Sequence, residues 1–546
     1  MKIKNLFLYN PAEKTEAQQL TPSADGLENN PGLNNYIKNN IKNKDSSVYR
    51  TGKVSSQLAE NLDFIHDAFE CGKNFDLMVR QFKIQNSGKA VDAFLIFYDG
   101  LVNKNFINRD IMRPLMTNTA STKNSESPED AVYKIMLTQA PNSKNEDMQS
   151  IIELVGFGNC AVFVDGCSCA FVADVKGWGT RNVGKPISEA VLSGPQEAFT
   201  ETVMTNIALI RKILKDPNLI AENIPVGTKS KTPCALMYLN GITNISLVKE
   251  ARDRLKAIET EYIFSSADIE MMIEESTVFP FPQLLKTERP DRAAAQLADG
   301  KVIIIVQGSP FVLILPATAA DLAESSEDNY VRIAEANFMR AVRLAGCFLA
   351  LFLPGIFISV VLYHHESIPT DLLFAIEATR EKMPFPIVLE LIIMVLSFEL
   401  IKEASTRVPD PIGSTLGIVG GLILGQSAVS AGIASPLLII IVSITALGSF
   451  AAPSVSISRA LSVMQFIFIF LGATAGFTGI ATGVFVLSVC LAASHPFGVP
   501  YIPASNGSDS PFFVPPIWKR ESRPRALYPQ SVSKQPHISR KWKGDE

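Results

Sequence analysis

A long stretch without charged side chains constrains this chain more than any other feature. Between Asp410 and Arg459 the sequence has no Lys, Arg, Asp or Glu, and between Arg459 and Asp509 only His495 can carry a charge. Charged residues are frequent up to Arg343. Such a run, in a chain that is 47% hydrophobic and 19% charged, is typical of membrane-spanning segments. We therefore expect a soluble N-terminal part followed by a membrane part.

The N-terminal end indicates the side of the membrane on which the soluble part lies. The start, MKIKNLFLYNPAEK, has a run of only four apolar residues before Asn10, which is too short for the core of a signal peptide. The soluble part is therefore expected in the cytoplasm, where the seven cysteines would stay reduced. A net charge of −4 gives no overall basic field that would collect nucleic acid.

The pattern along the chain predicts a multidomain protein. Strand, turn and helix patterns alternate between Val54 and about residue 335, as in VDAFLIFYDGLV and CAVFVDGCSCAFVADVKG. They favour an α/β (α+β) cytoplasmic region of two subdomains, followed by an all-α bundle of transmembrane helices. The expected parts are a flexible arm (1–53), a first subdomain (54–154), a second subdomain (155–335, with a hairpin at 302–315), a transmembrane helical region (336–494) and a basic cytoplasmic tail (495–546).

The stretch DGKVIIIVQGSPFVLILPA, Asp299 to Ala317, is nearly long enough for a membrane span but predicts two strands. A span requires roughly 20 apolar residues in a helix, whereas this run is interrupted at its centre by Gly308-Ser309-Pro310. Proline inside a helix costs about 3 kcal/mol, and Gly-Ser suits a two-residue hairpin turn. Both arms are apolar on every residue, so we expect a hairpin buried on both faces. A re-entrant membrane loop is the alternative.

Five apolar segments are long enough to be considered as membrane helices. Arg340 and Arg343 precede the first one and place its start in the cytoplasm. The tail from Lys519 carries eight Lys or Arg against three acids and is expected on the same side. Two cytoplasmic ends require an even number of crossings, so either the segment 384–401 does not cross or the last run turns back within the bilayer. The segments are 344–363, 384–401, 413–433, 436–452 and 461–494.

Two sets of glycines lie at helical spacing in this membrane part. Small residues spaced three or four apart let helix backbones approach closely in lipid. Packing within one bundle and packing between subunits of an oligomer are both compatible with the pattern. The glycines are Gly413, Gly417, Gly421 and Gly425 in the first set, and Gly472, Gly476, Gly479 and Gly483 in the second.

Two carboxylates, Glu390 and Glu399, lie within the apolar segment 384–401. Ionisable groups inside a membrane are costly and usually face protein or water. Nine positions at about 100° each put the two side chains on opposite helix faces. Both are candidates for an ion or proton path, although Glu399, beside Lys402, is close enough to the helix end to reach the interface.

The sequence has no motif that indicates catalysis. The glycines at Gly156–Gly158 and Gly177–Gly179 match neither a dinucleotide-binding nor a P-loop pattern. The five histidines include no His-Glu-x-x-His arrangement, and the cysteine spacing matches no common zinc site. We therefore expect no enzyme activity, no metal site and no cofactor.

Two long stretches resemble one known family. SGPQEAFTETVMTNIALIRKIL and PFPQLLKTERPDRAAAQLADGKVIIIVQGSPFVLILPAT are similar to the A subunit of the GerA-type spore germination receptors of endospore-forming bacteria. The first holds a Gly-Pro-x-Glu-x-Phe pattern that runs into an Asn-x-x-Leu-Ile-Arg helix. The chain departs from the family at Ser193 and Ala198, where the family usually has Arg and Gly. The resemblance covers about residues 55–500.

The resemblance implies a subunit of a receptor in the inner membrane of the dormant spore. Family members act with a transporter-like B subunit and a lipid-anchored C subunit, sense nutrients such as amino acids, sugars or nucleosides, and trigger ion release. The A subunit is implied to form a homo-oligomer that conducts ions. The first hypothesis is thus an oligomeric, nutrient-gated cation path, and its rival is a signal-relaying scaffold without a pore. A secondary transporter fits less well, because five segments leave no room for matched repeats.

The motif residues are expected at the junction through which a nutrient signal passes into the membrane part. Pro290 and Asp291 predict the start of a short helix that Gly300 ends, and Glu288 and Arg289 are expected to pair at its entrance. A structural latch and a ligand-binding role both stay open for this group. The residues on the family pattern are Gly194, Pro195, Glu197, Arg211, Glu288, Arg289, Pro290, Asp291, Gly308 and Pro310.

Overall fold

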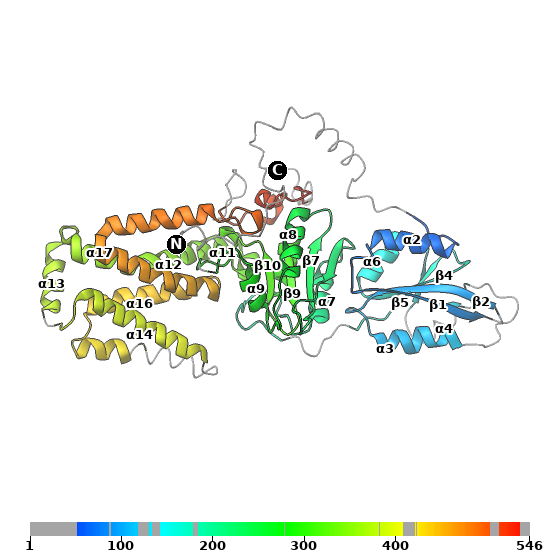
Figure 1. Ribbon diagram of the computed structural model, residues 1–546, viewed down its shortest axis with the longest axis horizontal. Coiled ribbons are helices and arrows are strands. Elements are labelled where there is room, and N and C mark those ends of the chain that lie inside the picture. The colour runs from blue at the N-terminus through cyan, green and yellow to red at the C-terminus, as the bar shows by residue number, and fades with distance from the viewer. Residues whose placement is uncertain are drawn as a thin grey trace, which may run out of the picture.

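The computed structural model divides into two sheet-containing domains and one region of long helices (Figure 1). The expected arm, residues 1–53, lies almost wholly outside the described residues, as do Gly413 and Gly417. The structure describes residues 52–86, 89–117, 129, 132–133, 142–177, 184–277, 279–381, 383–407, 421, 423–502 and 513–534.

The first domain is built on an antiparallel five-stranded sheet with the order β1-β2-β4-β5-β3. Phe94 and Ile96 of β2 pack into one hydrophobic layer, and Leu95 and Phe97 pack into the other. Helices cover both faces, so the strand is apolar on consecutive residues. The strands are β1 (Leu77–Asn86), β2 (Lys89–Tyr98), β3 (Asn142–Asn145), β4 (Asn159–Val164) and β5 (Ala170–Asp174). The helices are α2 (Leu58–Ala68) and α6 (Met148–Gly156) on one face, with α3 (Lys104–Phe106), the π-helical turn η3 (Ile107–Met112) and α4 (Arg113–Thr117) on the other.

The second domain repeats this design with an antiparallel sheet of order β6-β7-β9-β10-β8. Helices again cover both faces and enclose two hydrophobic clusters. The strands are β6 (Leu219–Asn223), β7 (Cys234–Leu239), β8 (Leu285–Thr287), β9 (Val302–Val306) and β10 (Val312–Leu315). The helices are α8 (Ile245–Lys256) and α9 (Ser266–Ile273) on one face, and α7 (Val203–Ile213) and α10 (Pro290–Ala298) on the other.

The boundary between the two domains differs from the sequence prediction. The expected division near Val155 is wrong, because β4 pairs with β2 and β5 pairs with β3 in the first sheet. The first domain therefore continues through Asp174. The segment 159–174 was correctly predicted as strand, turn and strand, but a local pattern does not say which sheet a strand joins.

The stretch Val302–Leu315 is a β-hairpin, and the re-entrant loop is excluded. Ile304 pairs with Leu313, and every residue of β9 and β10 is buried. Alternate residues enter the two hydrophobic clusters, so the arms are buried on both faces as expected. The predicted two-residue turn is wrong, because five residues, 307–311, connect the strands. Gly308, at φ +88°, donates its N–H to the carbonyl of Glu201 at 2.8 Å, so contact with a neighbouring loop shapes this turn.

The C-terminal half forms a region of long helices. Among the described residues, α12 (Ile333–Tyr363) and α17 (Val455–Ala493) are long and apolar enough to cross a membrane. The first predicted segment is thus helical and begins at Ile333, before the expected Leu344. The remaining helices are α11 (Ala319–Ala323), the 3-10 turn η4 (Ser326–Asn329), α13 (Thr370–Arg380), α14 (Ile387–Arg407) and α16 (Pro436–Phe450).

Helix α17 reverses direction at Gly476. This glycine has φ +59° and ψ −141°, which only glycine adopts readily. Gly483 lies against Leu471 and Phe468, so the second half of α17 packs antiparallel on the first half (Figure 1). The last apolar run therefore turns back, which was one of the two options that the sequence left open.

The helix ends show that the chain passes repeatedly along this bundle. Arg340, near the start of α12, and Gly448, near the end of α16, lie towards the second domain, because Arg340 binds Asp328 and Gly448 packs on Gly346 of α12. Tyr363, at the end of α12, contacts Gly476 at the opposite end. Helices α14 and α16 run in the same direction, because Glu390 in the first turn of α14 meets Ser435 at the start of α16, and Lys402 further along α14 meets Ser449 near the end of α16. Both ends of the helical region thus emerge on the side of the sheets.

Candidate functional site at the domain junctions

The two motif stretches meet at the entrance to α10. Glu288 accepts hydrogen bonds from the Ile187 N–H and the Ser188 hydroxyl, both at 2.8 Å. Arg289 is fully buried, and it donates to the Pro195 carbonyl at 3.1 Å and to Asp291 at 2.9 Å. The expected pair between Glu288 and Arg289 is therefore wrong: each side chain ties a different part of the loop before α7. The helix start at Pro290 and the end at Gly300, with φ +96°, are as expected.

Tyr330 connects this cluster to the beginning of the helical region. Its hydroxyl donates to Asp291, and its ring packs on Gly194 so closely that a Cβ there would lie 2.8 Å from the ring. Partial burial, followed by the hydrogen bond to Asp291, raises the pKa of Tyr330 to about 12. The phenol therefore stays a neutral donor. Gly194 and Asp291 thus both contact Tyr330, which lies three positions before the start of α12.

Asp328 holds the start of α12. It is buried, and it binds Arg340 at 3.2 Å and also Arg343. From the sequence, these arginines indicated only the cytoplasmic end of the first apolar segment, and Asp328, which lies in η4 two residues before Tyr330, was not predicted as their partner. The cluster formed by Gly194, Asp291, Tyr330, Asp328 and Arg340 is called the junction cluster below.

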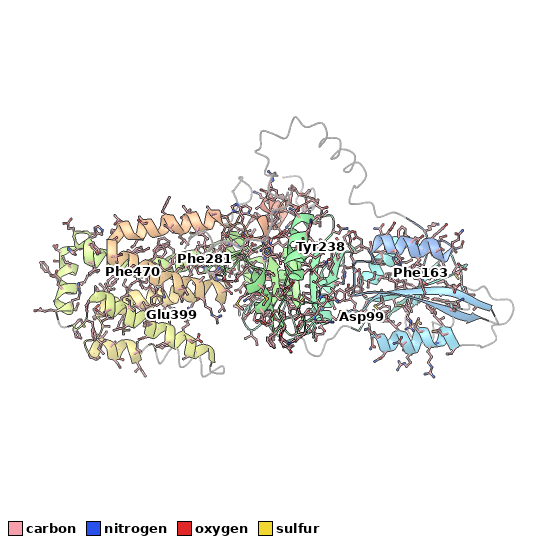
Figure 2. The ribbon with its side chains drawn as sticks, in the orientation of Figure 1. Asp99, Phe163, Tyr238, Phe281, Glu399 and Phe470 are labelled. Atoms are coloured by element: carbon pink, nitrogen blue, oxygen red, sulfur yellow. The ribbon has the colours of Figure 1, made fainter. Side chains whose placement is uncertain are left out.

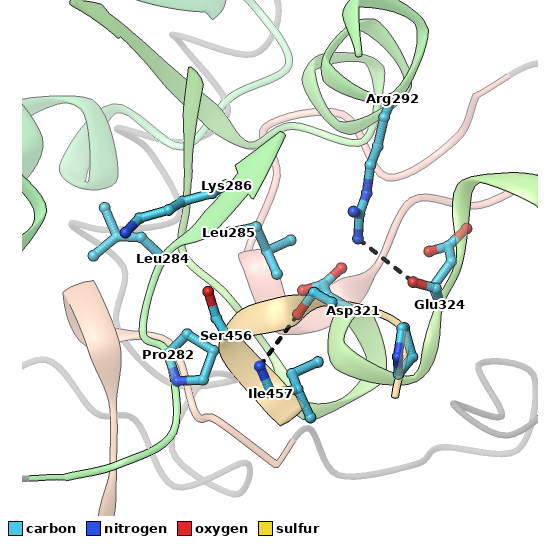
Figure 3. Close-up of a pocket in the computed structure, with 11 residues that line it drawn as sticks. Pro282, Leu284, Leu285, Lys286, Arg292, Asp321, Glu324, Ser456 and Ile457 are labelled. Carbon is cyan, nitrogen blue, oxygen red and sulfur yellow. Dashed lines mark hydrogen bonds between the residues drawn. The ribbon is translucent and has the colours of Figure 1, made fainter. Parts of the chain in front are cut away.

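A small cavity lies where α17 begins against the second domain (Figure 3). Arg292 pairs with Glu189 there and donates to the Glu324 carbonyl at 3.5 Å. Beside it, Lys301 pairs with Asp321 at 2.5 Å. Burial acts to raise the pKa of Asp321, but the Lys301 ammonium and hydrogen bonds from Thr318 outweigh it and lower the pKa. The lining consists of Pro282, Leu284, Leu285, Lys286, Arg292, Asp321, Glu324, Pro453, Ser454, Ser456 and Ile457.

Arg211 lies at a different junction, between the two sheet domains. It binds both carboxylate oxygens of Asp76, at 2.6 and 2.8 Å, and donates to Asn74 at 3.1 Å and to the Leu219 carbonyl at 2.9 Å. Its guanidinium also lies 4.1 Å from the ring centroid of Tyr98. Burial acts to lower the pKa of Arg211, but the charge of Asp76 outweighs it and raises the pKa. Arg211 is thus a fully paired latch between domains.

Three other motif residues have less central positions. Glu197 pairs with Lys212 at 2.6 Å on a half-exposed surface. Gly308 contacts the loop before α7 through the hydrogen bond from its N–H to the Glu201 carbonyl. Pro310 is half-buried in the same turn between β9 and β10. The structure therefore places the motif residues at two junctions instead of one site.

The two membrane carboxylates do not converge. Glu390 is buried and accepts a hydrogen bond from the Ser435 N–H, at the start of α16. Glu399 accepts one from the Ser462 hydroxyl at 2.7 Å and lies within the helical region (Figure 2). The nine helical steps from one to the other span about 13 Å. They belong to separate environments, one apolar and one rich in hydroxyl groups.

The described glycines pack within one chain. Gly472 lies on the Gly355 backbone of α12, where a Cβ would come within 2.5 Å of the Gly355 carbonyl oxygen. Gly476 is the turn, and Gly479 and Gly483 pack inside the α17 hairpin. Despite their helical spacing, Gly472 to Gly483 do not form one continuous helix face, because the chain reverses at Gly476. A Cβ added at Gly421 would lie 3.8 Å from Phe398 of α14, and one added at Gly425 would lie 3.6 Å from Ile439 of α16.

We expect Gly472→Ala to destabilise the helical region by about 1–3 kcal/mol, because an added methyl group forces α12 and α17 apart. Thermal unfolding of the full-length protein in detergent measures this. Gly421→Ala is the matched control, since its new Cβ would meet ordinary van der Waals space. Equal stability of the two variants would contradict the close crossing.

Comparisons with known proteins show the family of this chain. The family model described as "Bacillus/Clostridium GerA spore germination protein" matches residues 65–526. Spore germination protein KA of Bacillus subtilis (strain 168) is 36% identical over 490 residues, which cover 89% of this chain and 88% of that protein. Spore germination protein A1 of the same strain is 40% identical, over 65% of this chain and 74% of its own length.

A solved structure matches about half of the chain. It is the N-terminal domain of the A subunit of the Bacillus megaterium spore germinant receptor GerK3, which is 28% identical over 48% of this chain and 96% of that chain, with a TM-score of 0.38. The family match extends well beyond this part and includes both motif stretches and the helical region. The chain therefore belongs to the GerA family of Bacillus and Clostridium spore germination proteins.

Proposed function

We propose that this chain is the A-type membrane subunit of a spore germination receptor and couples nutrient sensing to ion release. The observation that supports this most is the junction cluster. It joins the loop before α7, the entrance to α10 and the first turns of α12 through buried charges and one tyrosine. A change of position in the soluble part would be carried to α12 through these contacts, because buried ion pairs fix geometry over short distances.

We also propose the arrangement in the membrane. Helices α12, α14, α16 and the two halves of α17, with the return between α14 and α16, would give six crossings. Both soluble ends then lie in the cytoplasm of the spore inner membrane. The tail supports this, because Gln530 donates to the Thr243 carbonyl of the second domain at 2.7 Å.

The subunit would act with the transporter-like B subunit and the lipoprotein C subunit, and several copies would surround a cation path. The described glycines are already used within the chain, so contacts between copies would use other surfaces of the bundle. A scaffold that relays the signal without a pore of its own is the second candidate, favoured by the separation of Glu390 from Glu399.

The test is reconstitution of the full-length chain with its B and C partners in liposomes. The measurements are oligomeric state by native mass spectrometry and K⁺ efflux after addition of a mixture of amino acids, sugars and nucleosides. We expect an oligomer and nutrient-dependent efflux that liposomes with only the B and C subunits lack. A monomeric A subunit without added efflux would favour the scaffold.

A further inference from the structure

Lys402 has an unusual environment inside the apolar helical region. Its ammonium nitrogen lies 3.0 Å from the hydroxyl oxygen of Ser458 and 3.3 Å from those of Ser449 and Ser462. A carboxylate oxygen of Glu399 lies 3.8 Å away. These four oxygens, from α14, α16 and α17, are called the oxygen cage below.

The cage oxygens present lone pairs to the ammonium. The Ser449 hydroxyl donates to the Ala446 carbonyl at 2.8 Å, and the Ser462 hydroxyl donates to Glu399 at 2.7 Å. With their protons directed elsewhere, both hydroxyls accept from Lys402, which has three donors and no acceptor. The interior of the cage is therefore built to receive a positive charge.

Two further features favour a cation at this place. Ser449 lies in the last turn of α16, and the C-terminal end of a helix carries partial negative charge. The ring of Phe450 lies with its centroid 5.6 Å from the Lys402 nitrogen, a distance at which an aromatic face attracts a cation. The Lys402 side chain is only 20% exposed, so water supplies little of its solvation.

We propose that the oxygen cage is a binding site for a monovalent cation of the size of K⁺, and that Lys402 occupies it as a tethered substitute. An alkylammonium group and K⁺ carry the same charge and have similar radii. Both are stabilised in proteins by a shell of oxygen atoms that replaces water. Withdrawal of Lys402 would leave three hydroxyls and one carboxylate around a vacated position.

The assignment of a role in gating rests on the proposed function, whereas the binding site rests on the contacts alone. In the structure, Lys402 ties α14 to α16 and α17 at the end of the bundle nearest the second domain. Rotation of the Lys402 side chain out of the cage, with Glu399 of the same helix left in place, would remove the ammonium and open the cage. Lys402 would then act as a built-in block on a cation path that passes this point.

The experiment measures cation binding to full-length protein in detergent, with radioactive rubidium ions as the probe. We expect Lys402→Ala to show saturable binding that K⁺ displaces and Li⁺ displaces poorly, with an affinity at least about tenfold above that of the unaltered chain. Lys402→Arg, which keeps a positive charge at the cage, is the matched control and should not gain binding. Adding Ser458→Ala to Lys402→Ala should reduce the affinity again by about tenfold.

Two results would overturn the proposal: no saturable binding in Lys402→Ala, or binding that Ser458→Ala leaves unchanged. If Lys402→Ala does not fold, Lys402→Ser serves as the second variant, because its hydroxyl fills part of the space without a charge. Efflux from liposomes is measured with the same variants. Rubidium binding without efflux would retain the cage and argue against the conducting role, so the two failures are distinguishable.

Discussion

Replacing Arg211 with methionine is expected to lower the free energy of unfolding by about 3–5 kcal/mol, the range found when one partner of a buried ion pair is removed. Methionine keeps much of the length of the side chain, so the loss reports mainly on polar contacts. Asp76 would stay buried without a cation, and Asn74 and the Leu219 carbonyl would lose a donor.

Arg211→Lys separates charge from geometry. A lysine ammonium is a point charge and cannot reproduce the planar fork that binds two carboxylate oxygens. We therefore expect Arg211→Lys to lose most of the same stability. Lys212→Met is the matched control, because the neighbouring Lys212 pairs with Glu197 on a half-exposed surface, and such pairs contribute about 0–1 kcal/mol.

Hydrogen exchange followed by mass spectrometry locates the effect. The Phe75 N–H donates to the Ala221 carbonyl at 3.2 Å, and the Ala221 N–H donates to Asn74 at 2.8 Å. Both amides bridge the two sheet domains, so they should exchange faster in Arg211→Met while the hairpin amides near Ile304 stay protected. Unchanged exchange at Phe75 and Ala221 would show that Arg211 is not the latch.

Asp328→Asn is expected to abolish most of the nutrient response of spores that carry this chain, while the protein still reaches the membrane. The substitution removes the carboxylate that binds Arg340 and Arg343, and it leaves one buried and one partly buried positive charge without it. Breaking a buried ion pair costs about 3 kcal/mol or more of stability. Without these pairs, the first turns of α12 would no longer be held in one position relative to Tyr330. The measurement is K⁺ release from spores after addition of a nutrient mixture, with subunit abundance checked by immunoblot.

Glu327→Gln provides the control for Asp328→Asn. It changes the same charge in the same 3-10 turn, but Glu327 is only half-buried. We expect a normal response from it. A normal response from Asp328→Asn at normal abundance would rule out the junction cluster as the route of the signal. A double-mutant cycle with Arg340→Gln then measures how much of the effect belongs to this pair.

Positions for which one local pattern carried the information were predicted correctly from the sequence. The arms of the hairpin at Val302–Leu315 are apolar on every residue, which suits only strands with both faces covered, and proline at its centre opposed a helix. The helix from Pro290 to Gly300 was marked by its own end residues. The apolar helix before Tyr363 was marked by length and composition.

Partners far apart in the sequence were not predicted, since no local pattern encodes them. Arg211 and Asp76 are 135 positions apart, and Lys402 meets Ser458 across 56 positions. The expected pair of neighbours, Glu288 and Arg289, was wrong because Glu288 binds the Ile187 N–H and Arg289 binds the Pro195 carbonyl, both about a hundred positions away. A charged residue in a sequence indicates that it requires a partner if it is buried. It does not indicate which residue the partner is.

The sequence by itself determined which half of the chain forms long apolar helices, because a helix that is long enough to cross a membrane must be apolar at most of its positions. Only the tertiary structure decided how the helices are folded together. Three features depend on which surfaces meet: the reversal at Gly476, the pairing of β4 and β5 in the first sheet, and the oxygen cage around Lys402. The same local sequence patterns allow many arrangements, and packing between distant segments selects one of them.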